Sequence, residues 1–351
     1  MIVVIPSNRR IELSYLEPLI ECGARFIVVD DSDGTIAVDH PRFKVYNWRD
    51  RRRILGPLED YFPRRNGACR DFGFCLAWRE SDPGEAIVAL DDDCRVYRED
   101  FAAAVEWSLS EAARPVATAS GDHLNILDLY SGSQAGLFPR GFPYSARVDY
   151  APATIEKMDR RRVLFSLGMW KGFFDVNAVD KVEGRRYDFP DAELRHGSVT
   201  IARTKLVSVC SMNMQFRREV VPAAYQLPMH VEVIPGGVID RYGDIWGGFI
   251  LKTLMDLNGD ALAVGEPMVE HLKDGDYVRN IWQENLCHQI NDEFLVLLGA
   301  AKADLRPAPY LDMIEGLNDA FQARAGKCSP LLRRYLAHLT PALSAWTTAL
   351  R

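Results

Sequence analysis

Three consecutive aspartates, Asp91, Asp92 and Asp93, directly follow an apolar run at residues 86–90. Their carboxylates would repel one another, since unit charges ~4 Å apart interact by about 4 kcal/mol at an effective dielectric constant of about 20. A divalent cation removes this repulsion, and Mg²⁺ or Mn²⁺ binds through one or two carboxylates while substrate phosphates complete its shell. The triplet therefore predicts a site for Mn²⁺ or Mg²⁺ and a diphosphate, and the alternative is a solvated acidic turn or helix N-terminus.

Two further residues could complete such a site. His271 follows a second apolar run and could supply an imidazole to the same metal, although a single histidine is more often structural. Asp244 stands among Tyr242, Trp246 and three glycines that permit close backbone approach. This mixture is typical of carbohydrate sites, because aromatic faces cover sugar CH groups while carboxylates accept hydroxyl hydrogens. Asp244 would equally serve as a helix N-cap.

Arginines occur in short clusters, and guanidinium groups match the oxygens of a diphosphate in bidentate geometry. Most surface arginines have no specific role, so clustering alone assigns none of them. The chain has no P-loop, and no GxGxxG motif follows its first strand, which argues against a P-loop NTPase and a dinucleotide-dependent oxidoreductase. The clusters are Arg49, Arg51, Arg52 and Arg53; Arg64, Arg65 and Arg70; and Arg140 and Arg147.

Apolar runs of strand length alternate with stretches of helix length in the first half of the chain, the pattern of an α/β fold with a mostly parallel sheet flanked by helices. We expect strands at residues 2–5, 26–29 and 86–90, and helices at 11–22, 68–79 and 99–113. Ligands of open α/β sheets bind beyond the carboxyl ends of the strands, so the polar residues there should converge on one crevice. Those residues are Ser7, Asn8, Asp30, Asp31 and the aspartate triplet.

The second half of the chain has a different character. Residues 121–191 are rich in glycine, proline and aromatic side chains with weak periodicity, which predicts long loops on the sugar side of the site. Residues 208–216, 241–252 and 261–271 look like return elements of the same domain, giving a catalytic domain at 1–276 and a C-terminal helical region at 277–351. Apolar positions at helical spacing should pack on the sheet or a second subunit: Val278, Ile281, Trp282, Leu286, Ile290 and Phe294.

Composition limits the classes of function. The net charge of -7 and a pI near 5.6 argue against a nucleic-acid-binding surface. No run of about 18 apolar residues occurs, and residues 2–5 resemble a strand rather than a leader, so we expect no membrane span, no secretion and a cytoplasmic location. Seven scattered cysteines without a CxxC pair indicate reduced thiols and argue against a zinc–cysteine site.

The order of several motifs resembles that of the plant reversibly glycosylated polypeptides, also known as UDP-arabinopyranose mutases. The likeness spans most of residues 1–300, and the sequence after residue 170 and in the C-terminal helices is less similar. The matching stretches are 47–57 (NWRDRRRILGP), 68–73 (ACRDFG), 91–94 (DDDC), 140–147 (RGFPYSAR), 210–214 (CSMNM) with Phe216, and 241–248 (RYGDIWGG).

The resemblance implies a GT-A-like, Rossmann-like fold and the roles of several residues. Asp91 and Asp93 would correspond to the metal motif. Arg140 would occupy the position of the reversibly glycosylated arginine, beside the anomeric carbon, with Arg147 as its companion. An arginine that bonds to carbon needs a nearby carboxylate, a role that Asp244 could fill. Residues expected to hold the base, ribose and diphosphate are Ser7, Asn8, Asp30, Asp31, Arg53, Arg70 and Asp92.

The implied activity is a metal-dependent, flavin-free interconversion of the pyranose and furanose forms of a nucleotide-diphosphate sugar. The substrate would be UDP-L-arabinose, or a GDP-linked hexose such as an L-galactose or L-fucose derivative. One alternative is a GT-A glycosyltransferase that passes the sugar to an acceptor. Another is a non-catalytic subunit that binds the nucleotide sugar and assembles with partners, or with copies of itself, through its C-terminal helices.

Overall fold

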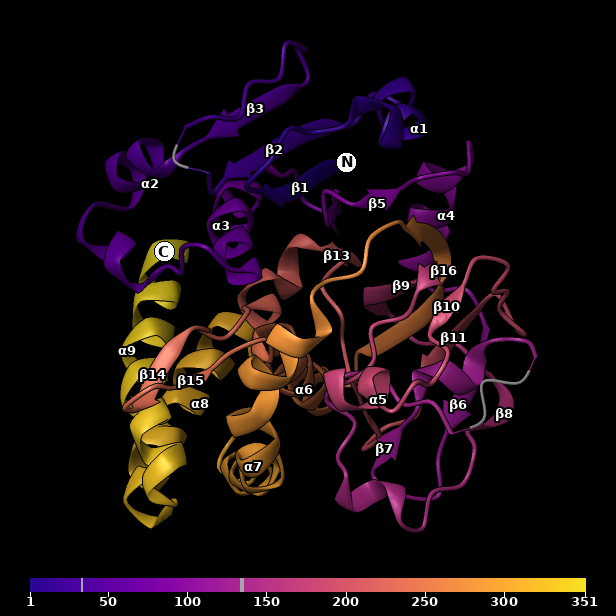
Figure 1. Cartoon of the computed structure of the whole chain (residues 1–351). Helices are drawn as coiled ribbons and strands as arrows, with labels where there is room; N and C mark the ends of the chain where they lie inside the picture. The colour runs from indigo at the N-terminus through magenta and orange to yellow at the C-terminus, as the bar shows by residue number, and fades with distance from the viewer. Residues whose placement is uncertain (33, 133–135) are drawn as a thin grey trace.

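The structure is a computed structural model that describes residues 1–32, 34–132 and 136–351 (Figure 1). Within these residues the main sheet is mixed and has twelve strands. Ten of its strands follow the order β3-β2-β1-β4-β13-β9-β16-β11-β6-β8. In that order their bounds are Phe43–Tyr46, Arg25–Asp30, Ile2–Ser7, Ala86–Leu90, Asn213–Arg217, Val163–Phe173, Ala261–His271, Ser198–Ile201, Arg114–Thr118 and Thr154–Asp159. Two short strands add to it, β10 (Asp188–Phe189) on β9 and β5 (Cys94–Arg95) on β16.

Strand direction brings the carboxyl ends of several strands to one edge of this sheet. β1 to β4 run parallel to one another, β9 runs parallel to β16, and β13 lies antiparallel between β4 and β9. The carboxyl ends of β1, β4, β9 and β16 therefore point the same way, toward the edge where ligands bind in open α/β sheets. The predicted α/β class, with a sheet flanked by helices, is confirmed.

The strands expected early in the chain match their predictions, while two of the three expected helices are shorter than predicted. β1, β2 and β4 contain the expected apolar runs, and β16 has the expected bounds. The helix expected at 68–79 is α3 (Arg70–Glu80), and that at 99–113 is the shorter α4 (Phe101–Ser108). The helix expected at 11–22 reduces to a 3-10 turn and α1 (Glu17–Glu21), because Pro18 is tolerated only in the first turn of a helix.

The prediction of loops throughout residues 121–191 is wrong. Residues 163–173 form β9, which lies between β13 and β16 in the middle of the sheet. Nine of its eleven residues are buried, so both of its faces pack against other layers. A strand buried on both faces has no alternation of polar and apolar residues, which is why the weak periodicity was misleading. β8 and α5 (Ala178–Val182) also lie in this region.

The C-terminal region is helical, as predicted, and packs on the rest of the chain (Figure 1). Trp246 of α6 stacks on Phe294 of α7 and contacts Tyr335 of α9. At the end of α9 the carbonyl of Leu350 accepts a hydrogen bond from Trp78 Nε1 at 2.9 Å. These helices are α6 (Gly243–Asn258), α7 (Tyr277–Lys302), α8 (Tyr310–Arg324) and α9 (Pro330–Leu350), while α2 (Trp48–Leu55) lies beside β3.

The predicted apolar positions of α7 divide between two environments. Leu286, Ile290 and Phe294 are buried against the core, whereas Val278 and Trp282 are 65% and 66% exposed. The apolar side chains of α7 therefore pack on the core only from Leu286 onward, while its first turns contact the protein through polar side chains such as Asn280 and Glu284. Across the described residues, no helix combines the length and the apolarity that a membrane crossing needs. Two small sheets complete the fold: β7 (His123–Leu124) with β12 (Leu206–Val207), and β14 (Val231–Ile234) with β15 (Gly237–Ile239).

Candidate active site

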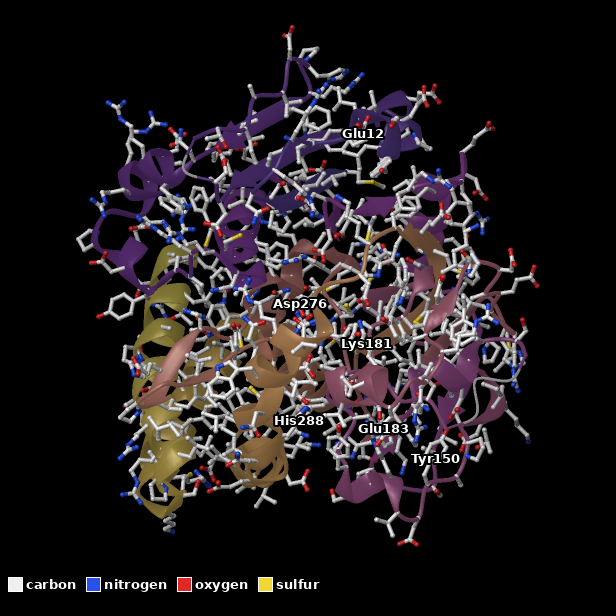
Figure 2. The ribbon with its side chains drawn as sticks, in the orientation of Figure 1. Glu12, Tyr150, Lys181, Glu183, Asp276 and His288 are labelled. Carbon is white, nitrogen blue, oxygen red and sulfur yellow. The ribbon has the colours of Figure 1, made fainter. Side chains whose placement is uncertain are left out.

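A cavity of about 480 Å³ lies at the edge where the four strands end. Its walls come from residues after β4, β9 and β16, from the start of α3 and α6, and from the start of α7 beside α5, where Figure 2 labels Asp276 and Lys181. The predicted site residues that line it are Arg70, Asp91, Asp93, Arg140, Asp244 and His271. Residues far apart in the sequence thus meet in one cavity, as the strand directions require.

The three aspartates after β4 accept hydrogen bonds from two arginines and a serine. Asp91 accepts a hydrogen bond from Arg70, whose other nitrogens donate to the carbonyls of Ser211 and Gly67. Asp92 accepts from Arg9 and from the hydroxyl of Ser7. Asp93 also accepts from Arg9, at 2.9 Å. The repulsion expected within the triplet is therefore relieved partly by two arginines.

The side chains of Asp93 and His271 fit a divalent metal ion. His271 Nδ1 lies 2.7 Å from the carbonyl oxygen of Phe173, a contact in which Nδ1 carries the proton and Nε2 keeps its lone pair. Nε2 is 3.9 Å from Asp93 Oδ1, too far for a hydrogen bond but a separation that two ligands of one ion can have.

The same neighbourhood is not a complete metal cage. Within the ranges that the structure describes, no three His, Cys, Asp or Glu side chains are grouped to hold an ion. Mg²⁺ and Mn²⁺ bind in such settings through one or two protein ligands, with substrate phosphates and waters supplying the others. The residues present therefore fit an ion that binds together with a diphosphate.

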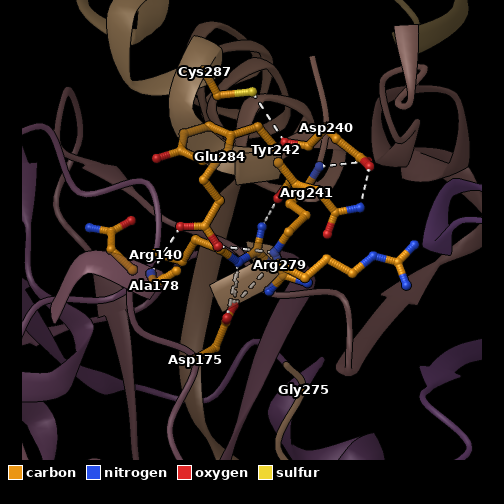
Figure 3. Close-up of polar contacts among 12 residues, drawn as sticks. Arg140, Asp175, Ala178, Asp240, Arg241, Tyr242, Gly275, Arg279, Glu284 and Cys287 are labelled. Atoms are coloured by element: carbon orange, nitrogen blue, oxygen red, sulfur yellow. Dashed lines mark hydrogen bonds and ion pairs between the residues drawn. The ribbon is translucent and has the colours of Figure 1, made fainter. Parts of the chain in front are cut away.

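Arg140 is held between two carboxylates, and Figure 3 shows its contact with one of them, Asp175. Its Nε and Nη2 donate to Asp175 at 2.9 Å, and Nη1 and Nη2 donate to Asp244 at 3.1 and 3.0 Å. Nη1 also donates to the backbone carbonyl of Arg241. A guanidinium carries five N–H groups, and these contacts use all five of them.

The charges of this cluster stabilise one another. Burial opposes the charge of Arg140, but Asp175 and Asp244 outweigh it and raise the pKa of the guanidinium well above its usual value. Burial likewise opposes the ionisation of Asp175, and the contact with Arg140 outweighs it and lowers the pKa of that carboxyl. At neutral pH the resting site therefore holds a charged Arg140 against an ionised Asp175.

The loop that carries Arg140 is fixed to the segment after β9. Pro139 and Val176 form an isolated β-bridge, and the amide of Gly141 donates to Asn177 Oδ1 at 3.2 Å. Gly141 has φ +84°, and a Cβ there would lie 2.2 Å from a side-chain carbon of Ile245 on α6. Only glycine fits this position without displacing α6, so the residue after Arg140 is set by the approach of that helix.

Several residues predicted to hold the nucleotide lie beside the cavity and not on its lining. Asp31 accepts from Trp48 Nε1 at 2.7 Å and from the backbone amide of Arg65. Burial is the main influence on Asp31, and it raises the pKa of this carboxyl. Because Arg65 lines the cavity, Asp31 supports its wall. Ser7 and Asp92 reach the cavity in the same indirect way, through Arg9.

Three other predicted nucleotide residues are not brought to the cavity. Asp30 is buried and accepts from the amide and hydroxyl of Ser32, so it orders its own loop. Asn8 is exposed. Arg53 pairs with Asp50 on α2, and its side chain is 72% exposed.

Arg147 also lies outside the residues that line the cavity. Its Nη1 and Nη2 donate to the two oxygens of Asp180 at 3.0 and 3.1 Å. The guanidinium carbon sits 4.5 Å from the ring centre of Phe138 and 4.2 Å from that of Tyr144. This packing ties the end of the Arg140 loop to α5, which suits a structural role.

The cavity also contains functional candidates that the sequence did not single out. Asp175 is the most prominent, because it binds Arg140 through both oxygens. It comes two residues after β9, so recognising that strand would have drawn attention to it as another acid at a strand end. Arg241 and Glu284 form an ion pair at 3.0 Å beside the same cluster. Glu284 lies on α7 within the C-terminal helical region, where no local motif marks it.

Comparison with known proteins agrees with this arrangement. Residues 2–350 match the family described as reversibly glycosylated polypeptide. The probable UDP-arabinopyranose mutase 4 of Arabidopsis thaliana is 28% identical over 81% of this chain and 75% of its own length. UDP-arabinopyranose mutase 1 of Oryza sativa subsp. japonica is 24% identical over 99% of this chain and 89% of its own length. Because the family match covers nearly the whole sequence, this chain belongs to the reversibly glycosylated polypeptide family.

Proposed function

We propose that this chain interconverts the pyranose and furanose forms of a UDP-linked sugar, with Mn²⁺ or Mg²⁺ and without a flavin. The observation that carries the proposal is that Arg140 shares one cavity with Asp91, Asp93 and His271. The resemblance to the family implies that Arg140 is the arginine that becomes glycosylated. UDP-L-arabinose is the first substrate to test, because the relatives are named for it. A GDP-linked hexose is the second.

Asp93 and His271, assisted by Asp91, would hold the metal ion. When bound, such an ion neutralises the negative charge that develops on a departing diphosphate. Arg70 and Arg9 already contact the aspartates, so both can turn toward phosphate oxygens that enter beside them. The acidic triplet and its arginines would together form the phosphate side of the site.

Arg140 would form the sugar side. Ring contraction requires the bond between C1 and the ring oxygen to break while C1 remains activated. A guanidine nitrogen of Arg140 bonds to C1 as the bond from C1 to the diphosphate breaks, and the nitrogen passes its proton to Asp244 or Asp175. The nitrogen lone pair then opens the ring to an imine-like species, and the ring oxygen takes up a proton. The C4 hydroxyl adds to C1 and passes its proton to the same carboxylate, which returns a proton to Arg140 as the diphosphate displaces it from C1.

The two carboxylates decide when the arginine loses its proton. Because they raise the pKa of Arg140, a neutral guanidine is not a stable resting form. The proton must therefore move as the bond to C1 forms, to a carboxylate that is already within hydrogen-bond distance. Asp175 and Asp244 would thus act as general bases and hold the guanidine nitrogen in position to bond to C1.

Product analysis tests the proposal. The protein is incubated with Mn²⁺ and a panel of UDP- and GDP-linked sugars, and pyranose and furanose forms are separated by chromatography. An isomeric nucleotide sugar formed without an acceptor supports the mutase. Transfer to an added acceptor would identify a glycosyltransferase, and tight binding with no product would identify a non-catalytic subunit.

A substitution at Arg140 tests the role of this residue separately. Arg140→Ala should abolish isomerisation while nucleotide affinity stays within about tenfold, or ~1.4 kcal/mol. Retained affinity shows that the variant is folded. Unaltered turnover would remove Arg140 from the mechanism.

A further inference from the structure

Arg241 has an unusual backbone conformation next to Arg140. Its φ is +64°, a region that residues other than glycine seldom adopt. This conformation directs its carbonyl oxygen to Nη1 of Arg140. Such backbone strain persists where the surrounding structure enforces it, often at functional sites. Arg241 lies between β15 and α6, and its side chain lines the cavity.

Glu284 fixes the side chain of Arg241 from the opposite direction (Figure 3). One oxygen of this buried carboxylate accepts from Arg241 Nε at 3.0 Å, and the other accepts from the amide of Ala178 at 3.0 Å. Burial disfavours its charge, but contacts with His288 and Arg241 outweigh this effect and lower the pKa of Glu284. The C-terminal helical region therefore supplies a permanent anion behind a cavity-lining arginine.

The two neighbouring arginines differ in what they can offer a ligand. The guanidinium of Arg140 has no N–H left for a substrate. In the part of the chain that the structure describes, the only side-chain nitrogen of Arg241 with a protein acceptor is Nε. Its side chain is 30% exposed. Nη1 and Nη2 therefore present a planar pair of donors to the cavity, the geometry that matches a phosphate group.

We propose that Arg241 binds the sugar-bearing phosphate of the nucleotide sugar and that Glu284 is its positioning residue. The assignment rests on the proposed function, because Arg140 there meets the anomeric carbon. The phosphate next to that carbon is the distal one, and Arg241 is the cation whose backbone contacts Arg140 directly. As the bond from C1 to the diphosphate breaks, Arg241 would keep the leaving phosphate in the site, so that the diphosphate can bond to C1 again at the end of the reaction.

The first test compares UDP with UMP, which lacks the distal phosphate, by calorimetric titration of the full chain. Arg241→Gly removes the side chain, suits the positive φ and keeps the carbonyl that Arg140 needs. It should weaken UDP binding by about 10- to 100-fold and leave UMP binding unchanged, since bonds to charged groups are worth this much. Arg279→Ala is the control, because it removes the same charge from an exposed position on α7 that does not line the cavity.

The outcomes separate this proposal from the function on which it rests. Equal UDP affinity in Arg241→Gly and wild type, or equal losses in Arg241→Gly and Arg279→Ala, would overturn the role of Arg241. If the wild-type chain binds no UDP and isomerises no nucleotide sugar, both proposals fail together.

A double-mutant cycle tests Glu284. Glu284→Gln keeps an acceptor for Arg241 but loses the charge, and it should weaken UDP binding by about 5-fold. In the Arg241→Gly background the same change should have no effect on UDP affinity, because there is no longer an arginine to position. An undiminished effect in that background would show that Glu284 acts in some other way and would overturn its positioning role.

Discussion

Asp175 holds Arg140 by side chain and backbone together. Its two carboxylate oxygens accept from Nε and Nη2 of Arg140 at 2.9 Å each, and its carbonyl accepts from the Arg140 amide at 2.9 Å. The loop after β9 therefore sets the position of the arginine and the direction of its guanidinium at once. This relationship makes Asp175 the residue on which the geometry of the proposed reaction depends most directly.

Asp175→Asn should lower kcat for isomerisation by about 100-fold, the usual contribution of a positioned general base, with a smaller effect on KM. The asparagine keeps the shape of the side chain but cannot take a proton from Arg140. The matched control is Asp180→Asn, which breaks a buried bidentate pair with Arg147 outside the cavity lining. Steady-state kinetics on both variants give the comparison, and equal losses would argue that Asp175 has only a structural role.

The same substitution should change how stability depends on pH. The pKa of Asp175 is depressed in the folded protein, so its ion pair stabilises the fold above the unfolded-state pKa near ~3.9 and loses this effect as pH falls toward the folded-state pKa. The destabilisation caused by Asp175→Asn should therefore be largest above about pH 5 and shrink below about pH 4. Urea unfolding across this range measures it. A constant difference at all pH values would contradict the ion-pair explanation.

Metal binding should depend on Asp93 and His271 more than on Asp92. Asp93→Asn and His271→Ala should each weaken Mn²⁺ binding about 10-fold or more, whereas Asp92→Asn, whose carboxylate faces Ser7 and Arg9, should weaken it less. Titration followed by the paramagnetic signal of free Mn²⁺ separates the three variants. Chelation by EDTA should also stop isomerisation. Full activity after chelation would refute the metal dependence.

Arg147 should matter for stability more than for chemistry. Its guanidinium lies between the rings of Phe138 and Tyr144 and pairs with Asp180 in bidentate geometry. Arg147→Lys cannot reproduce that flat, two-pronged contact, so we expect a loss of about 1–3 kcal/mol in unfolding free energy. Thermal and urea unfolding measure this loss. If kcat collapses while stability is unchanged, Arg147 belongs to the catalytic machinery after all.

Local patterns in the sequence predicted the strands that begin the fold and the acids that follow them. Asp91, Asp93 and His271 were found because each stands at the end of an apolar run, and the directions of β4 and β16 bring those ends together. Asp175 was missed because β9 is buried on both faces and has no periodicity that separates it from its surroundings.

Other parts of the site depend on contacts between distant segments, which no local pattern encodes. Arg147 and Arg53 occur in arginine-rich motifs, yet packing turns one toward Asp180 and leaves the other exposed. Glu284 comes to lie behind the cavity-lining Arg241 only because α7 folds back beside α5. Tertiary packing therefore decides which members of a motif reach the cavity.

The predicted boundary at residue 276 should not mark an independently folding domain. Removing residues 277–351 would expose Trp246, which stacks on Phe294 and contacts Tyr335, and Tyr225, which packs on Trp346. Each large apolar side chain that loses its cover costs about 1.5–3 kcal/mol, and a typical domain has only about 5–15 kcal/mol in total. We therefore expect the 1–276 fragment to be insoluble or to unfold without a cooperative transition. In the full chain, Trp346→Ala should cost about 3–5 kcal/mol. Calorimetry on the fragment decides the matter, because a sharp unfolding transition would establish two separable domains.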